Sequence, residues 1–270
     1  MNTTNTKQYR ATPQQLAFLK RELTSDQREV ISFIDKFNYA YGSQIQRLYF
    51  TQGNNLAMIR ARNRLLTRMV DLNLLYRYPR QPLSGNRHGS TEHIYTLDRT
   101  GQWIINELLN RNRPYRSLDR TTSHFSHSLY ATELYVRLKE LEPTNTVIVL
   151  SAFGEPGCHI PYGASALKPD AMFYLNVTKD NQPYEVGWFI EIEHYRHNHS
   201  TIQAKLKSYQ EYRDSLNSVK GFMPRVLFVT FDDGYKNYLT QFIDRHDDND
   251  QNLFVPTLFK DATQTMVTEI

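Results

Sequence analysis

A break in the hydrophobic pattern at residues 111–120, with the sequence RNRPYRSLDR, constrains the fold of this chain more than any other feature. The segment is polar and contains a proline, and it separates two stretches whose predicted elements differ. The chain has 270 residues, and one domain usually takes about 100–200 residues. We therefore predict two domains, at residues 22–113 and 121–265.

The two sides of this break carry opposite net charge. Residues 1–120 hold 19 Lys and Arg against 9 Asp and Glu, a net charge of +10, whereas residues 121–270 hold 13 against 19, a net charge of −6. A basic unit joined to an acidic one suggests a module that binds a polyanion, linked to a unit that uses carboxylates. The alternative is that surface charge segregated without a functional reason.

The composition excludes several classes of protein. The hydrophobic fraction of 40% and the charged fraction of 22% are typical of folded globular chains. Cys158 is the one cysteine, which excludes an intrachain disulfide and a zinc site built on cysteines. Because no stretch of about 18 apolar residues occurs and residues 1–10 are polar, we expect a cytoplasmic protein without a membrane span or secretory signal.

The first half has the element order of a winged helix-turn-helix. Apolar periodicity predicts helices at residues 24–38, from Ser43, and at residues 55–72. Residues 1–21 are polar and carry no strong period, so we expect them to be frayed. Two runs rich in strand formers, LLYRYPR and TEHIYTLD, flank a loop with one proline and two glycines, which is typical of a hairpin with a long loop. A further helix, TGQWIINELLN, follows.

The third helix of this half presents a polar and basic face opposite its apolar side. The residues of that face are Arg60, Asn63, Arg64, Thr67 and Arg68. In the major groove an arginine can pair with guanine, and an asparagine with adenine. The predicted wing adds Arg80, Arg87 and His88 where a flanking phosphate or the minor groove would lie. We predict that this helix binds duplex DNA; the alternative is an ordinary solvated basic face.

The second half predicts an α/β layer domain of order αβββαβ, so the whole chain mixes α+β and α/β classes. The predicted elements are a helix at 124–141, strands at 147–153, 169–177 and 184–193, a helix at 201–216, a strand at 226–231, a helix at 235–245 and a strand at 253–259. The turn KDNQP between the second and third strands is typical of a hairpin. These two strands are therefore expected to pair antiparallel.

Carboxylates occur inside the apolar strands of this half. In the strand that contains FIEIE, Ile190 and Ile192 share one face, so Glu191 and Glu193 share the other. Carboxylates buried in such a strand need a counter-cation or hydrogen-bond donors. Antiparallel pairing around the turn would bring Asp170 close to Glu191. The alternative is an edge strand whose two glutamates face solvent or pair with Lys or Arg.

The next helix supplies groups that complement these acids. Lys205 and Tyr209 lie four residues apart and share one helix face. Glu133 places another carboxylate on the apolar stripe of the first helix of this half. Converging carboxylate oxygens suit Mg²⁺ or Mn²⁺, and a lysine beside them can orient water and stabilise charge on a phosphoryl transition state. The pattern predicts metal-dependent phosphodiester cleavage, with Tyr209 the tyrosine closest to the acids.

Pro169-Asp170, followed by Glu191 on the next strand, resembles the signature of the PD-(D/E)xK restriction-endonuclease-like superfamily. Glu193 stands where that signature has lysine, and Lys205 on the following helix could take its role. The resemblance extends to an acid on the first helix, matched here by Glu133. The metal ligands that it implies are Asp170, Glu191 and Glu133, and the other site residues that it implies are Glu193 and Lys205.

Over about residues 24–230 the chain also resembles the replication-relaxation family, which is linked to conjugative relaxases of the MobC type. The resemblance rests on the segments RLLTRMVDLNLLYR, YTLDRTGQ, HFSHSLYATEL, LKPDAMFYL, FIEIEHY and AKLKSY. It implies a plasmid DNA relaxase that nicks one strand at an origin of transfer, with duplex DNA, the nicked strand and conjugation accessory proteins as partners. The alternative is a non-catalytic, sequence-specific DNA-binding protein, either a plasmid replication factor or a transcriptional regulator, with a degenerate nuclease fold.

The segment HYRHNH raises a competing hypothesis of a metal site on His194, His197 and His199. The metal-binding motif of tyrosine-dependent relaxases needs an apolar residue between its histidines. Here the polar Asn198 occupies that position, so the segment departs from the motif. A loop whose histidines contact DNA phosphates or solvent fits this segment better.

Overall fold

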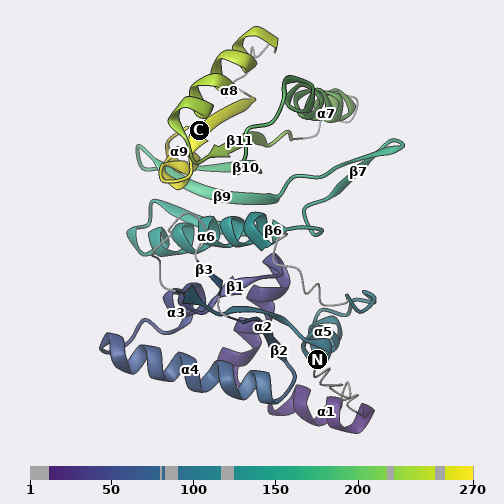
Figure 1. Ribbon diagram of the computed structural model, residues 1–270, viewed down its shortest axis with the longest axis vertical. Helices are drawn as coiled ribbons and strands as arrows, with labels where there is room; N and C mark the ends of the chain where they lie inside the picture. The colour runs from purple at the N-terminus through teal and green to yellow at the C-terminus, as the bar shows by residue number, and fades with distance from the viewer. Residues whose placement is uncertain are drawn as a thin grey trace, which may run out of the picture.

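The structure is a computed structural model that describes residues 12–79, 81–82, 91–116, 125–217, 222–246 and 253–269. Its two halves are stacked along the longest axis, with the N-terminal helices at one end and a larger sheet with its own helices at the other (Figure 1). No helix in these ranges is long and apolar enough to cross a membrane.

The N-terminal half contains helices around a small antiparallel sheet of order β1-β5-β2. Its elements are α1 (Pro13–Glu22), α2 (Ser25–Phe37), β1 (Ala40–Tyr41), α3 (Gly42–Tyr49), α4 (Asn55–Asp71), β2 (Leu75–Arg77), β3 (Gln81–Pro82), β4 (Thr91–Glu92), β5 (Ile94–Leu97) and α5 (Arg99–Leu108). The predicted helices and the two longer strands are present in the predicted order. Residues 80 and 83–90 lie outside the described ranges, and with them Arg80, Arg87 and His88.

Helix α1 corrects the expectation that residues 1–21 lack regular structure. Thr12 accepts a hydrogen bond from the backbone of Gln15, whose side chain accepts one in return from the backbone of Thr12. This capping box and a proline at the first helical position begin the helix. These terminal signals outweigh the weak apolar period that led to the wrong prediction; residues 1–11 are outside the described part of the chain.

The C-terminal half is built on a five-stranded mixed sheet of order β12-β11-β10-β9-β6. Its elements are α6 (Phe125–Leu141), η2 (Glu142–Thr144), β6 (Val147–Gly154), β7 (Ile160–Tyr162), β8 (Ser165–Leu167), β9 (Ala171–Lys179), β10 (Gln182–Glu193), α7 (His199–Asn217), β11 (Arg225–Thr230), α8 (Asp233–His246), β12 (Phe254–Leu258) and α9 (Ala262–Thr268). Strands β6, β9 and β10 pair antiparallel, whereas β10, β11 and β12 run parallel.

The predicted order of this half and the antiparallel pairing around KDNQP are confirmed, since Gln182 pairs with Lys179 across the turn. The hairpin of β7 and β8 and the last helix, α9, were not predicted. Helix α6 lies between the sheet and the N-terminal half, and α7 and α8 cover the other face (Figure 1). The alternation of FIEIE therefore sends the isoleucines toward α6 and the glutamates toward α7.

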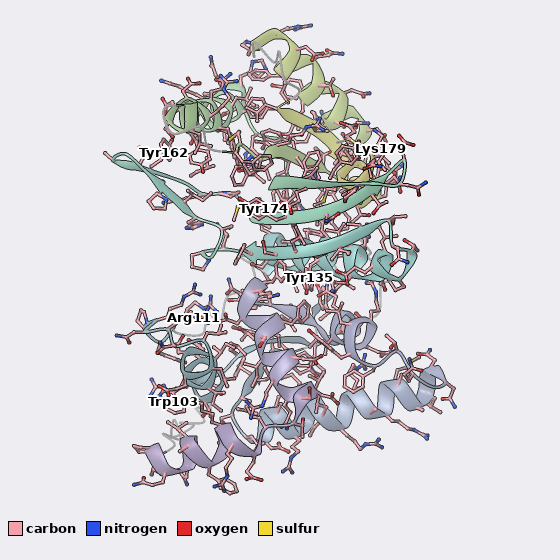
Figure 2. The ribbon with its side chains drawn as sticks, turned by 180° about the vertical axis from the view of Figure 1, so that it is seen from behind. Trp103, Arg111, Tyr135, Tyr162, Tyr174 and Lys179 are labelled. Carbon is pink, nitrogen blue, oxygen red and sulfur yellow. The ribbon has the colours of Figure 1, made fainter. Side chains whose placement is uncertain are left out.

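The two halves share one apolar cluster. Tyr135 of α6 lies where they meet (Figure 2), with its ring 5.7 Å from Phe33 and 5.1 Å from Phe37 of α2. Phe37 in turn stacks on Phe173 of β9, with ring centroids 6.1 Å apart. Burying large aromatic side chains strongly favours association, so this contact holds the N-terminal helices against the sheet.

Candidate active site

Glu191 and Glu193 lie on β10, which is the central strand of the large sheet. Only 5% of Glu191 and 2% of Glu193 is exposed. The alternative of an edge strand with solvent-facing glutamates is therefore wrong, whereas the pairing with a lysine that it also allowed is present. Two carboxylates at such depth require compensation by cations and hydrogen-bond donors.

Helix α7 supplies that compensation. The Nζ atom of Lys205 lies 2.7 Å from Oε2 of Glu191 and 2.6 Å from Oε1 of Glu193. The hydroxyl of Tyr209 donates a hydrogen bond of 2.5 Å to Oε1 of Glu191. Because the two helix residues are one turn apart, they reach the same acidic pair, as the spacing predicted.

Asp170 completes the cluster at the start of β9. Its backbone N–H donates to the carbonyl of Ile190 over 2.9 Å, and its Oδ2 accepts from the N–H of Ile192 over 2.6 Å. These bonds on either side of Glu191 fix Asp170 next to it. The other oxygen, Oδ1, lies 2.9 Å from Nδ1 of His127 on α6.

The structure brings three further residues to the cluster, two of which the sequence did not place there. His127 binds Asp170, His197 has its Nε2 atom 3.2 Å from Oε2 of Glu193, and the hydroxyl of Tyr235 lies 3.5 Å from the same oxygen. The exception is His127, because His124 and His127 lie three residues apart at a predicted helix start and either was expected to lie near the site. His197 was noted only as part of HYRHNH, and Tyr235 has no distinguishing pattern.

The electrostatics of the cluster reflect its burial. Loss of hydration raises the pKa of Glu191 to about 7, with Lys205 acting against the shift and Asp170 adding to it. Burial alone would lower the pKa of Lys205, but its two glutamate partners outweigh this and raise it. Burial and the neighbouring Glu191 raise the pKa of Tyr209 well above its ordinary value. The hydrogen bond that His127 donates to Asp170 raises the pKa of His127.

Glu133 is placed elsewhere. Both of its oxygens accept bonds from Arg47 of α3, at 2.8 and 2.9 Å, and Arg137 and Gln44 lie at 3.0 and 3.1 Å. Six residues after His127, Glu133 lies about 120° around the α6 helix, so the two side chains leave the helix in different directions. The structure thus joins Glu133 to an ion-pair network between the halves and does not bring it to Asp170 and Glu191.

Within the residues that the structure describes, no group of three or more His, Cys, Asp and Glu side chains is placed to hold one metal ion. The three histidines of HYRHNH have separate partners: His194 contacts Tyr130, His197 contacts Glu193, and His199 packs on the rings of two α8 residues.

Helix α4 presents its predicted polar face to solvent. Exposed side chains occur at all of the predicted positions, which are Arg60, Asn63, Arg64, Thr67 and Arg68. Leu66 and Met69 are buried on the other side. The helix lies at the end of the molecule opposite α7 (Figure 1), so the basic face and the acidic cluster are separated along the long axis.

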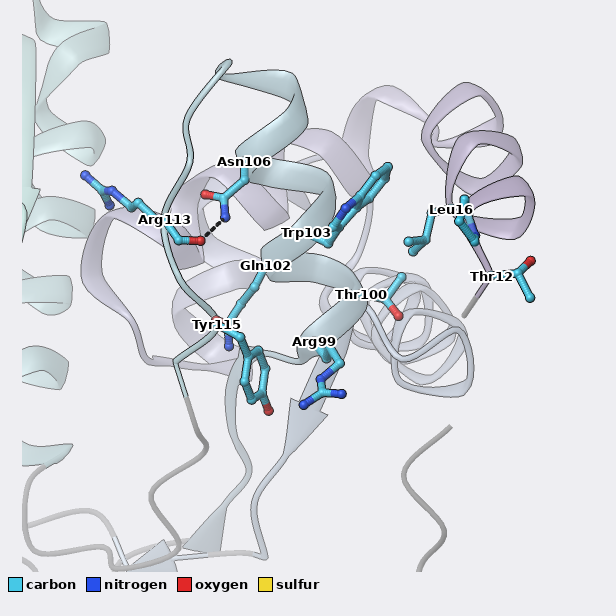
Figure 3. A pocket seen from close by; sticks show the side chains of 10 residues that line it. Thr12, Leu16, Arg99, Thr100, Gln102, Trp103, Asn106, Arg113 and Tyr115 are labelled. Carbon is cyan, nitrogen blue, oxygen red and sulfur yellow. Dashed lines mark hydrogen bonds between the residues drawn. The ribbon is translucent and has the colours of Figure 1, made fainter. Parts of the chain in front are cut away.

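A cavity of about 700 Å³ lies in the N-terminal half, between α1, α5 and the segment after α5 (Figure 3). Trp103 of α5 and Leu16 of α1 line it, and the Arg99 guanidinium lies 4.5 Å from the centre of the Tyr115 ring. It shares no lining residue with the acidic cluster and is not part of that site.

Comparison with known proteins places the chain in context. The model of a family described as Replication-relaxation matches residues 31–226. No curated protein matches significantly. A solved structure of the restriction endonuclease FokI bound to DNA is similar with a TM-score of 0.30 and 13% identity, over 94% of this chain and 50% of that one. The chain thus spans about half the length of that protein.

Proposed function

The chain belongs to the replication-relaxation family, and from this membership together with the acidic cluster we propose that it is a plasmid DNA relaxase. It would nick one strand of duplex DNA at an origin of transfer by metal-dependent phosphodiester cleavage. The observation that carries this proposal is the convergence of Asp170, Glu191 and Lys205, from β9, β10 and α7, on one buried site.

The donor set at this site fits a hard divalent cation. Asp170, directly before β9, and Glu191 of β10 offer two neighbouring carboxylates. Mg²⁺ and Mn²⁺ take such oxygens and retain several waters. When bound, the ion would polarise the phosphodiester and its attacking water.

The protein's own residues would position the reactants. The ammonium of Lys205 would hold the two glutamates in place and offset negative charge that develops on the phosphate. His127, more than a third exposed at its side chain, reaches from Asp170 toward solvent and would contact a phosphate oxygen. Tyr209 is a poor candidate for covalent attack because its hydroxyl is buried, its pKa is raised and it already donates to Glu191. We therefore favour water as the nucleophile.

The N-terminal half would act as a winged helix that locates the site, with α4 in the major groove. Its exposed Arg60, Arg64 and Arg68 lie on one face of a 17-residue helix, and a helix of this kind fits that groove. Because α4 and α7 are at opposite ends of the molecule (Figure 1), the DNA would have to run along the length of the protein to reach both.

The test is conversion of supercoiled plasmid carrying its own origin to open circles. We expect nicking with Mg²⁺ or Mn²⁺, none with EDTA, and none with D170N. The matched control is D214N, since Asp214 lies on α7 but has 65% of its side chain exposed. Retarded mobility of origin DNA on a gel without nicking under any metal would refute the relaxase proposal.

A second candidate function, a non-catalytic DNA-binding protein, is favoured by one observation. Lys205 already occupies an oxygen of each of Glu191 and Glu193, so these contacts can serve folding alone. Under this alternative the cluster is structural. D170N then lowers the stability of the protein, and neither D170N nor the wild type nicks DNA. The same plasmid assay separates the two candidates.

A further inference from the structure

Five rings form a connected cluster beyond the acidic site, which we name the aromatic platform. Its members are Tyr130, His194, Tyr195, Phe231 and Phe259. The Phe231 ring is the centre of the platform, with centroids 4.4 Å from Tyr130, 5.0 Å from Phe259 and 5.3 Å from His194. The ring of His194 lies 4.6 Å from that of Tyr195.

Two members of the platform are exposed to solvent. Tyr195 is 72% exposed and Phe231 is 41% exposed. Large apolar side chains grouped at a surface commonly mark a binding site. Phe231 makes three ring contacts, with Tyr130 of α6, His194 after β10 and Phe259 after β12, so its exposed face is presented in a defined orientation. Tyr195 extends this surface through its ring contact with the neighbouring His194.

The platform shares a sheet edge with the acidic cluster. His194 and Tyr195 directly follow Glu193, the last residue of β10, and Phe231 and Phe259 directly follow β11 and β12. These three strands run parallel, so their carboxyl ends lie together.

Helix α6 connects the platform and the acidic cluster in the same way. His127, which binds Asp170, and Tyr130, whose hydroxyl lies 3.2 Å from Nε2 of His194, are three residues apart and share one helix face. A ligand that reached Asp170 would therefore have its neighbouring atoms beside the aromatic platform.

We propose that the aromatic platform stacks the unpaired bases of the DNA strand next to the scissile phosphate. This inference rests on the proposed function, because it takes the acidic cluster as the site that holds that phosphate. Every base has a π-face, so stacking on aromatic side chains is tolerant of sequence. In a duplex the base faces are covered by neighbouring pairs, so the platform selects a locally opened or single strand. The exposed guanidinium of Arg196, next to Tyr195, lies at the rim and pairs with Asp232.

The test is fluorescence anisotropy of a labelled single strand of about 15 thymidines, with the full chain, in EDTA so that cleavage cannot contribute. We expect Y195A and F231A each to raise the Kd for the single strand by about tenfold. Y195W should retain binding, since it keeps an aromatic face. The control is Y184A, which removes a 46% exposed tyrosine from the opposite end of β10.

Two comparisons keep the outcome specific. An abasic strand of the same length should bind wild-type protein and Y195A equally, since it has no base to stack, and duplex origin DNA should bind both proteins equally. The proposal is overturned if Y195A and F231A bind the single strand as Y184A does, or if duplex binding falls in parallel. The binding assay measures no cleavage, so its result is independent of the nicking assay. A loss of single-strand binding in Y195A and F231A can be observed whether or not the wild type nicks plasmid DNA.

Discussion

Replacing Lys205 by methionine would leave two buried carboxylates facing each other without a counter-charge. Methionine keeps most of the length of the side chain, so the change removes the ammonium with little loss of packing. The two contacts of the Lys205 ammonium, at 2.7 Å to Glu191 and 2.6 Å to Glu193, are both lost. We expect K205M to be folded at low pH and markedly destabilised at slightly alkaline pH.

The magnitude follows from the distances. At an effective dielectric constant of about 20, each contact corresponds to a Coulomb attraction of about 6 kcal/mol. Dehydration of the ammonium and repulsion between the glutamates offset much of this. Removing one partner of a buried ion pair costs about 3–5 kcal/mol in practice, against a total stability of about 5–15 kcal/mol. We therefore expect K205M to lose about 3 kcal/mol of unfolding free energy near pH 8.

The loss should shrink in acid. The pKa of Glu191 is already raised from 4.5 to about 7 in the folded protein, and removing Lys205 raises it further. A carboxyl with a raised pKa binds its proton more tightly in the folded state than in the unfolded chain, so stability falls as pH rises from 4.5 through that raised value. Near pH 5.5, Glu191 of K205M would be protonated and would need no counter-charge.

The assay is urea unfolding followed by tryptophan fluorescence, to which Trp103 and the buried Trp188 both contribute, at about pH 5.5 and 8. The matched control is K207M on the same helix, where Lys207 is 73% exposed at its side chain and lies 3.7 Å from Glu211. Such exposed pairs contribute about 0.2–1 kcal/mol. A loss for K205M no larger than that for K207M, or a larger loss at the lower pH, would refute the reasoning.

Two further predictions concern the basic face and the histidine of the cluster. R64A should weaken binding to origin duplex by roughly 1–3 kcal/mol if Arg64 contacts a base; unchanged affinity and sequence preference in a gel-shift titration would contradict this. H127Q should destabilise the protein more at about pH 5.5 than at pH 9, because the bond to Asp170 raises the pKa of His127, and the resulting stability is present below its ordinary pKa of 6.5 and lost as pH rises through the raised value. Equal losses of unfolding free energy at the two pH values would argue against that pair.

Local periodicity was sufficient to predict the parts of the site that depend on one element or one turn. Strict alternation along FIEIE separates the glutamates from the isoleucines, whatever the rest of the fold does. The spacing of four between Lys205 and Tyr209 puts them on one helix face, and a short polar turn pairs the strands that carry Asp170 and Glu191. These features survive because strand and helix geometry is the same in every protein.

The positions that depend on how elements pack could not be predicted in this way. Glu133 lies on an apolar stripe and resembles the first-helix acid of the endonuclease-like superfamily. Its carboxylate nevertheless pairs with Arg47, 86 residues earlier in the chain. The spacing of His124 and His127 at a helix start does not identify which of them reaches Asp170. The rings of the aromatic platform come from residues between 130 and 259.

The amino-acid order by itself therefore determined most of the longer helices and strands, their order, and the strand face that Glu191 and Glu193 share. Only the tertiary structure decided that α6 lies between the two halves, which directs Glu133 to Arg47 and His127 to Asp170. The physical reason is that local geometry sets the direction in which a side chain leaves its own helix or strand. Its partner is set by the packing of apolar surfaces far apart in the chain, and such packing leaves no periodic pattern in the sequence.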